Sequence, residues 1–192
     1  MTRRIAELAT AIAVTGCLVG GSGLLAGCAS KSGSGSKSSN SSSSTSTVAS
    51  TVSFDEVTVT DATTLSDKPK VSAASNNQPS TLQVKDLVVG TGQAATPTST
   101  VTVQYVGIRY ADGKQFDASW DHGGATSFSL TQVVPGFTQG IGGTQSIPAM
   151  KVGGRRLMIL PAALGYGAAG TPDGSIPPNA PIVFVVDLVG VN

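Results

Sequence analysis

Charge of either sign is sparse in this sequence of 192 residues. The chain has 12 Lys and Arg residues and 11 Asp and Glu residues, which gives a formal net charge of +1 at pH 7. A partner such as nucleic acid would need an extended basic surface, and this composition does not supply one. We therefore expect no nucleic-acid partner, and a core of the size that one domain of about 110 residues can bury.

Cysteine and histidine are also scarce, with two Cys and one His in the whole chain. Protein sites for transition metals commonly combine several Cys, His or acidic side chains at short spacing. His122 has no Cys or second His near it in the sequence, so we expect it to lie in an exposed loop. We expect no metal and no other cofactor. The glycine-rich runs lack the Lys and Ser or Thr of a phosphate-binding loop.

The N-terminus has the features of a secretion signal. Basic residues at Arg3 and Arg4 precede an uncharged apolar stretch over 8–25, and the tetrapeptide that ends in Cys28 resembles a bacterial lipobox. The resemblance implies that a signal peptidase removes residues 1–27 and that the Cys28 thiol carries a diacylglycerol. A transmembrane helix is the alternative, since about eighteen apolar residues can span a bilayer. The Gly, Ala and Thr content and the small residues before Cys28 favour the lipoprotein signal.

Lipidation at Cys28 would anchor the protein at the extracytoplasmic face of the bacterial cell membrane. The other cysteine would be removed with the signal, so thiol chemistry and a disulfide are not expected. Residues 28–50 are rich in Ser, Gly and Thr and predict a flexible tether with a reach of roughly 25 Å. Residues 51–81 form an extension that we expect to be partly ordered. Its weak alternation fits either one or two strands or a linker, and both alternatives stay open.

A globular pattern begins at residue 82 and continues to residue 192. Apolar and polar residues alternate strictly over 100–105, which predicts a strand with one buried face. The other predicted strands are 82–89, 126–130, 155–160 and 182–189. Pro135 is well placed to open a short helix over 136–141. Many short strands and one short helix predict an α+β domain built on an antiparallel sheet.

Seven short motifs follow one another in this domain. They are Val103-Gln-Tyr-Val-Gly107, Asp112-Gly-Lys-Gln-Phe-Asp-Ala-Ser119, Val133-Val-Pro-Gly-Phe137, Met150-Lys-Val-Gly-Gly-Arg155, Gly165-Tyr-Gly167, Ile176-Pro-Pro178 and Val183-Phe-Val185. Each motif alone is weak, but the ordered set over 82–192 resembles the FKBP family of peptidyl-prolyl cis/trans isomerases. The resemblance implies a strongly twisted antiparallel sheet wrapped around one short helix, with a prolyl pocket between them.

Carried over residue by residue, the resemblance implies two sets of site residues. The candidate catalytic residues are Tyr105, Phe116, Asp117, Tyr166 and Phe184, and the candidate substrate-binding residues are Val133, Val134, Phe137 and Ile176. In this family the Tyr166 hydroxyl and the Val134 amide would donate hydrogen bonds to the ligand. Phe137 would form the floor, and Asp117 would bond a tyrosine or a ligand hydroxyl. The implied partners are proline-containing polypeptides and immunosuppressant macrolides of the FKBP-ligand type.

An apolar site without a nucleophile suits this reaction. Rotation about a peptide bond costs ~18–20 kcal/mol because twisting destroys amide resonance, yet no covalent bond has to break. The planar amide is the more charge-separated state, so moving it out of water destabilises it more than the twisted transition state. A few placed donors can then favour the twisted geometry.

Three positions depart from the family pattern. Phe137 stands where most members have Trp, Thr126 where most have an aromatic residue, and Ser175 where most have an apolar one. Residues 143–148 also read as an insertion. Two hypotheses therefore remain open: a working isomerase that assists the folding of exported proteins, and a catalytically weak binding module or holdase for proline-containing segments. The retained aromatic and acidic site residues favour the first.

Overall fold

The computed structural model describes residues 49–192, and these residues form two antiparallel sheets. The larger sheet consists, in spatial order, of β4 (Gln83–Val88), β8 (Arg155–Leu160), β9 (Ile182–Val191), β5 (Thr100–Arg109) and β6 (Gln115–Ala118). Strand β7 (Thr126–Ser129) also pairs with β5. The smaller sheet has the order β1 (Thr51–Phe54), β2 (Val57–Thr60) and β3 (Lys70–Ala73). Cys28 and most of the predicted tether lie outside the described residues.

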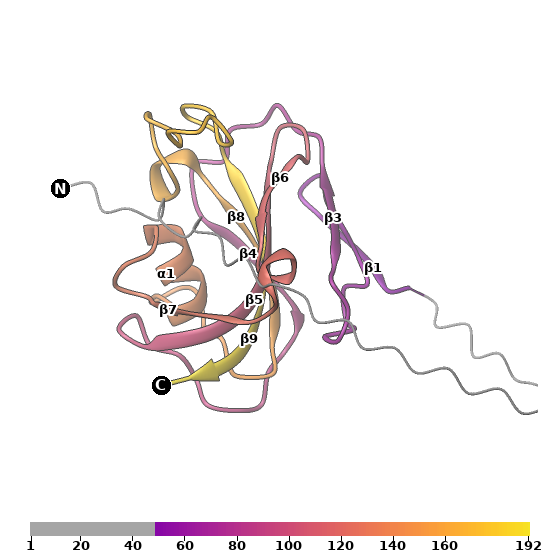
Figure 1. Cartoon of the computed structure of the whole chain (residues 1–192), viewed down its shortest axis with the longest axis vertical. Helices are drawn as coiled ribbons and strands as arrows, with labels where there is room; N and C mark the ends of the chain where they lie inside the picture. Colours follow the sequence, from indigo (N-terminus) through magenta and orange to yellow (C-terminus); the bar gives the residue numbers. More distant parts are fainter. Residues whose placement is uncertain (1–48) are drawn as a thin grey trace, which may run out of the picture. The chain divides into compact units, whose positions relative to one another are not determined.

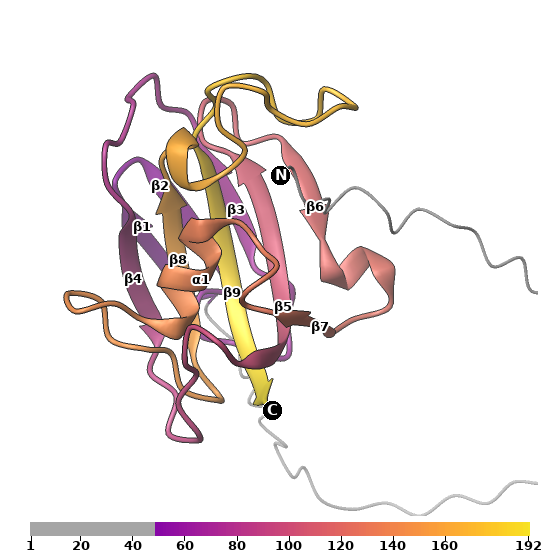
Figure 2. The same cartoon turned by 90° about the vertical axis from the view of Figure 1, so that its left-hand side faces the viewer.

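One α-helix is found in the described range, α1 (Pro135–Gly142). It begins at a proline, whose missing N–H and fixed φ suit the first turn of a helix. The helix lies across one face of the larger sheet (Figure 2), and glycines on its buried side allow a close approach. A Cβ atom at Gly136 would lie 2.6 Å from the Cγ and Cδ2 atoms of Leu160 on β8. Two 3₁₀ turns, η1 (Ser119–His122) and η2 (Ala162–Leu164), complete the elements.

The larger sheet is covered on both faces. Figure 1 shows α1 on one side of it and the β1–β3 sheet on the other. Strand β5 takes part in both cores, because Val103 and Tyr105 belong to the cluster under α1, whereas Val106 and Ile108 belong to the cluster under the smaller sheet. Val57 and Val59 of β2 are fully buried in that second cluster. The extension is therefore part of the folded domain.

These elements confirm the predicted α+β fold, an antiparallel sheet with one short helix. The expected strand over 100–105 continues to Arg109, and α1 begins one residue before its predicted start. Strand β6 was not among the strand ranges predicted from the sequence. Its residues, QFDA, alternate between polar and apolar, but a run of four residues is short for such a pattern to be recognised. For residues 51–81 the structure has strands β1 to β3, followed by an irregular segment up to β4.

A buried guanidinium on β8 fastens the extension to the larger sheet. Arg155 of β8 is completely buried and donates to both carboxylate oxygens of Asp187 on β9, at 2.5 and 2.7 Å. The same guanidinium donates to the backbone carbonyls of Asp61, at 2.7 Å, and Asp67, at 3.0 Å. Both carbonyls lie between β2 and β3. Since an unpaired buried charge is costly, the two bonds to Asp187 hold the guanidinium in place, and the two bonds to the carbonyls constrain the loop between β2 and β3.

The described part of the chain contains no helix with the length and hydropathy that a membrane span requires.

Replacing Arg155 with Met should lower the free energy of unfolding by ~3–5 kcal/mol, because Asp187 would remain buried without its partner. The control is Arg109→Met, which removes an ion pair with the more exposed Asp112 and should change the unfolding midpoint little. Urea unfolding followed by circular dichroism measures both. Equal effects of the two substitutions would contradict a structural role for the buried pair.

Candidate active site

Five aromatic rings meet between α1 and the larger sheet. Each comes from a different element: Tyr105 from β5, Phe116 from β6, Phe128 from β7, Phe137 from α1 and Phe184 from β9. The centroids of Phe137 and Phe184 lie 5.3 Å apart at 77°, and those of Phe116 and Phe184 lie 5.5 Å apart at 86°. Tyr105 packs against Phe184 at 6.1 Å. These edge-to-face contacts are the geometry that ring quadrupoles favour. We call these five residues the aromatic cluster.

The absence of a side chain at Gly107 leaves space for two of these rings. It pairs with Phe184 across β5 and β9. A Cβ atom on Gly107 would lie 2.6 Å from Cζ of Phe116 and 2.8 Å from Cε1 of Phe184, which is closer than carbon atoms approach. The rings therefore pack directly over the glycine backbone.

A polar group lies at the edge of the aromatic cluster. The Tyr105 hydroxyl donates to Oδ2 of Asp117 at 2.5 Å, and Nε2 of His122 lies 3.0 Å from Oδ1 of the same carboxylate. Burial raises the pKa of Tyr105 well above its usual range, and the hydrogen bond and negative charge of Asp117 raise it further. Burial is also the main cause that raises the pKa of Tyr166, followed by the charges of Asp117 and Asp173. Both phenols therefore keep their protons at neutral pH and can donate hydrogen bonds.

The structure brings the sequence-predicted site residues together. Four of them, Tyr105, Phe137, Ile176 and Phe184, are buried members of the core cluster under α1, and four more are partly buried against it: Phe116, Val133, Val134 and Tyr166. Asp117 joins them through its bond to Tyr105. Val134 directly precedes α1, and Tyr166 follows η2. The arrangement offers an apolar, largely desolvated surface with a few hydrogen-bond donors at its edge.

The structure shows the surroundings of two departures from the family pattern, Thr126 and Ser175. Thr126 and Phe128 lie two residues apart on β7 and so face the same side, and Phe128 packs its ring against Tyr105 at 5.9 Å. Alternation along 126–129 could have identified Phe128, which sequence reasoning missed. Ser175 bonds Asp173 at 2.9 Å and Thr171 at 3.0 Å, so its hydroxyl is satisfied within its own loop.

Two further features were not foreseen from the sequence. His122 is exposed as expected, with 68% of its side chain accessible, yet its ring contacts Asp117. In the insertion over 143–148, the Thr144 amide bonds the Ile147 carbonyl at 2.8 Å. The Arg156 guanidinium connects the end of the insertion to α1. It donates to the carbonyl of Pro148, at 2.8 Å, and to that of Gly140 in α1, at 2.7 Å.

Other candidate sites are weaker within residues 49–192. No group of three His, Cys, Asp or Glu side chains there is placed to hold a metal ion. A hollow of about 300 Å³ lies away from the aromatic cluster; its lining residues are Lys68, Pro69, Lys70, Val71, Val106, Ile108, Gly113 and Gln115. It contains none of the predicted site residues.

Comparisons with known proteins agree with this geometry. Residues 91–189 match the family described as FKBP-type peptidyl-prolyl cis-trans isomerase. The FK506-binding protein of Streptomyces anulatus is 42% identical over 127 residues, which cover 65% of this chain and 98% of that relative. FkpA of Escherichia coli is 41% identical over 102 residues, covering 53% of this chain but only 34% of FkpA.

Solved structures give the same result. The crystal structure of AtFKBP13 has a TM-score of 0.55 and 33% identity, covering 63% of this chain and 98% of that one. FkpA from Escherichia coli has a TM-score of 0.52 and 36% identity, covering 63% of this chain and 51% of that one. The chain belongs to the FKBP-type peptidyl-prolyl cis-trans isomerase family. Strands β1 to β3 lie outside residues 91–189, the range that the family model matches.

Replacing Gly107 with Ala should displace the Phe116 and Phe184 rings, and should reduce isomerase activity together with stability, the latter by ~1–3 kcal/mol. Gly190→Ala on β9 is the matched control, since the nearest atom to a Cβ there would be Cβ of Thr102 at an ordinary 3.5 Å. A proline-peptide assay and thermal unfolding measure the two quantities. Parent-level activity in Gly107→Ala would show that the rings do not need their present positions.

Proposed function

We propose that the aromatic cluster is the prolyl site of this isomerase, with Tyr105, Phe116, Asp117, Tyr166 and Phe184 in catalytic roles. The proline ring would rest on Phe137, and the bond that rotates would lie beside Phe184 and Tyr105. The observation that carries the proposal is the convergence of five rings from five elements beside a single carboxylate, which binds the Tyr105 hydroxyl, with Tyr166 packed against the same core.

The reaction would proceed by desolvation and hydrogen bonding without covalent catalysis. Water stabilises the planar, charge-separated amide, so its transfer among aromatic rings costs the ground state more than the twisted transition state. The Tyr166 hydroxyl and the Val134 amide would donate to carbonyls of the substrate, holding the chain on either side of the proline. Val133 and Ile176 would complete the apolar walls. Asp117 would hold the Tyr105 ring in place through its short bond to the hydroxyl.

Two substitutions at the site should differ in kind. Phe184→Ala removes a wall and a buried core side chain, so we expect a large loss of turnover and a destabilisation of ~3–5 kcal/mol. Tyr166→Phe removes one hydroxyl and keeps the ring. It should lower kcat/KM only modestly, because one neutral hydrogen bond contributes ~0.5–1.5 kcal/mol.

A control separates stability from activity in this comparison. Phe54 of β1 is a partly buried Phe that packs on the opposite face of the larger sheet, so Phe54→Ala should cost stability and leave kcat/KM unchanged at temperatures where the variant is folded. Loss of all turnover in Tyr166→Phe, with turnover intact in Phe184→Ala, would contradict desolvation as the main contribution.

Phe137→Trp should hold or raise activity, since it enlarges the aromatic floor. Parent protein that binds proline-rich chains without isomerising them would instead be a binding module.

We also propose that the isomerase works on exported polypeptides at the extracytoplasmic face of the bacterial membrane, held there by lipid on Cys28. The support is the lipobox-like tetrapeptide after an apolar segment and a basic start. Two or three acyl chains would anchor the protein stably, whereas one chain binds only weakly. The names of two relatives, FK506-binding protein and probable FK506-binding protein, support macrolides of that type as further ligands of the aromatic cluster.

Cys28→Ala should leave the protein without lipid, because no second cysteine follows it in the sequence. Metabolic labelling with a fatty acid and membrane fractionation measure the outcome in the producing strain. The serine-rich tether offers a control, since Ser41→Ala should be labelled like the parent. Fatty acid incorporation by Cys28→Ala at the parent level would overturn the lipoprotein assignment.

A further inference from the structure

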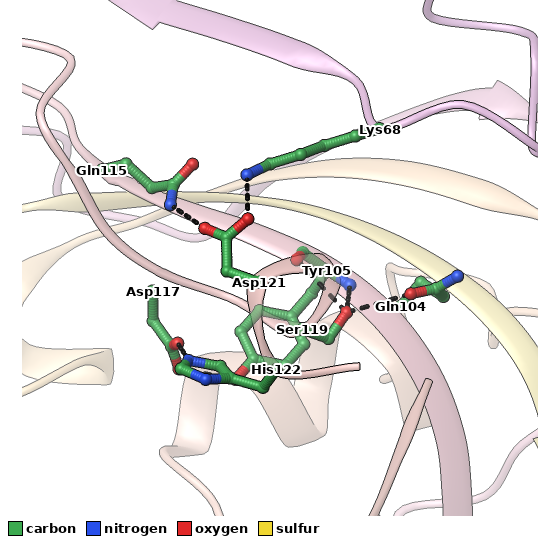
Figure 3. A network of polar contacts seen from close by, with 8 residues as sticks. All are labelled: Lys68, Gln104, Tyr105, Gln115, Asp117, Ser119, Asp121 and His122. Atoms are coloured by element: carbon green, nitrogen blue, oxygen red, sulfur yellow. Dashed lines mark hydrogen bonds and ion pairs between the residues drawn. The ribbon is translucent and has the colours of Figure 1, made fainter. Parts of the chain in front are cut away.

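The extension reaches the edge of the candidate active site through one ion pair. Nζ of Lys68, in the segment just before β3, lies 2.6 Å from Oδ1 of Asp121 in η1, across a sequence separation of 53 residues (Figure 3). Gln115 donates to the other oxygen of Asp121 at 2.8 Å. The carboxylate is therefore held from both sides, once by the extension and once by β6.

The same 3₁₀ turn, η1, carries Ser119 and His122, which contact the polar groups at the edge of the site. The Tyr105 amide donates to the Ser119 hydroxyl oxygen at 2.9 Å, and Ser119 in turn lies 3.3 Å from Oε1 of Gln104. His122, at the other end of η1, contacts the Asp117 carboxylate that receives the Tyr105 hydroxyl. Figure 3 shows these groups gathered around the turn. A shift of η1 would therefore reach Tyr105 at its backbone and at its hydroxyl.

Lys68 is itself fixed from the extension side. The backbone carbonyl of its neighbour Asp67 accepts a hydrogen bond from the buried Arg155 guanidinium at 3.0 Å. A second attachment comes from the Tyr110 hydroxyl, which donates to the Asp55 carbonyl at 3.0 Å. Lys68 thus extends from an anchored loop, and its pairing with Asp121 can hold η1 in place. The ion pair lowers the pKa of Asp121, with Gln115 as the next cause.

We propose that Lys68 is a positioning residue for the isomerase, acting through Asp121 and η1 on the Tyr105 and Asp117 pair. This inference rests on the proposed catalytic roles of those two residues. It gives the extension, which lies before residues 91–189 of the family-model match, a part in setting the activity of the site. A lone lysine at the surface would contribute nothing of this kind.

The test compares Lys68→Met with Lys70→Met in the full-length protein. Lys70 is an exposed lysine two residues further along that lines the same hollow, so it controls for net charge and for general steering of peptides. We expect Lys68→Met to lower kcat/KM about two- to fivefold, the range of a partly exposed ion pair, and Lys70→Met to leave it unchanged. Lys68→Arg keeps the charge and should restore parent activity.

Asp121→Asn tests the other partner of the ion pair. Because Lys68 and Asp121 act as one unit, the double variant should lose no more activity than either single variant. Raising the salt concentration should lower kcat/KM of the parent towards that of Lys68→Met and should leave the variant unaffected. Trp120, the one tryptophan of the chain, lies in η1 and reports on this turn. Its emission should change in Lys68→Met and remain at the parent value in Lys70→Met.

Unchanged kcat/KM in Lys68→Met would overturn the inference, whatever the Trp120 emission does. Equal losses in the Lys68 and Lys70 variants would also overturn it, because charge alone would then explain them. Asp117→Asn distinguishes this failure from a failure of the proposed site. If Asp117→Asn and Phe184→Ala lose activity while Lys68→Met does not, only the positioning role is wrong. If they keep parent activity, the proposed site is wrong and the positioning role fails with it.

Discussion

The structure depends on the burial of both faces of one sheet. Strands β5, β8 and β9 carry apolar side chains on each face, and all six residues of β8 are buried. A sheet of this kind must be covered twice, since apolar surface left in water costs roughly 25 cal/mol per Å². Helix α1 covers one face and the β1–β3 sheet covers the other. The aromatic cluster forms under the first cover, and the buried Arg155 fixes the second.

Site geometry follows from this double cover. Because β5 is held on both sides, Tyr105 can project towards α1 with its ring packed by Phe137 and Phe184 and its hydroxyl bonded to Asp117. Two residues along the same face, Gly107 leaves the space that the Phe116 and Phe184 rings occupy. Rings that are packed in place before the substrate arrives need little reorganisation during the reaction, which adds to the effect of desolvation in favouring a twisted amide.

Much of this could be predicted from the sequence. Strict alternation revealed the first half of β5, and Pro135 marked the start of α1, because both signals are local. The ordered motifs contain four of the five residues of the aromatic cluster, all except Phe128. Contacts between distant segments were not predictable: nothing local in the polar segment after residue 60 indicates that Asp61 and Asp67 receive bonds from Arg155, or that Lys68 pairs with Asp121. Phe128 lies two residues after Thr126, on the same face of the predicted strand, so alternation alone places it beside the site.

The most direct test of a prolyl site at the aromatic cluster is an NMR titration of the isotope-labelled protein with a short proline-containing peptide. We predict exchange between the cis and trans peptide signals that speeds up with added protein. In the protein, the shifts should move for the amides of Gly107 and Val134 and for the ring of Phe184, while the amides of β1 and β2 stay in place. Shifts confined to the face under β1–β3, or peptide exchange without any change at Val134 and Phe184, would contradict the assignment.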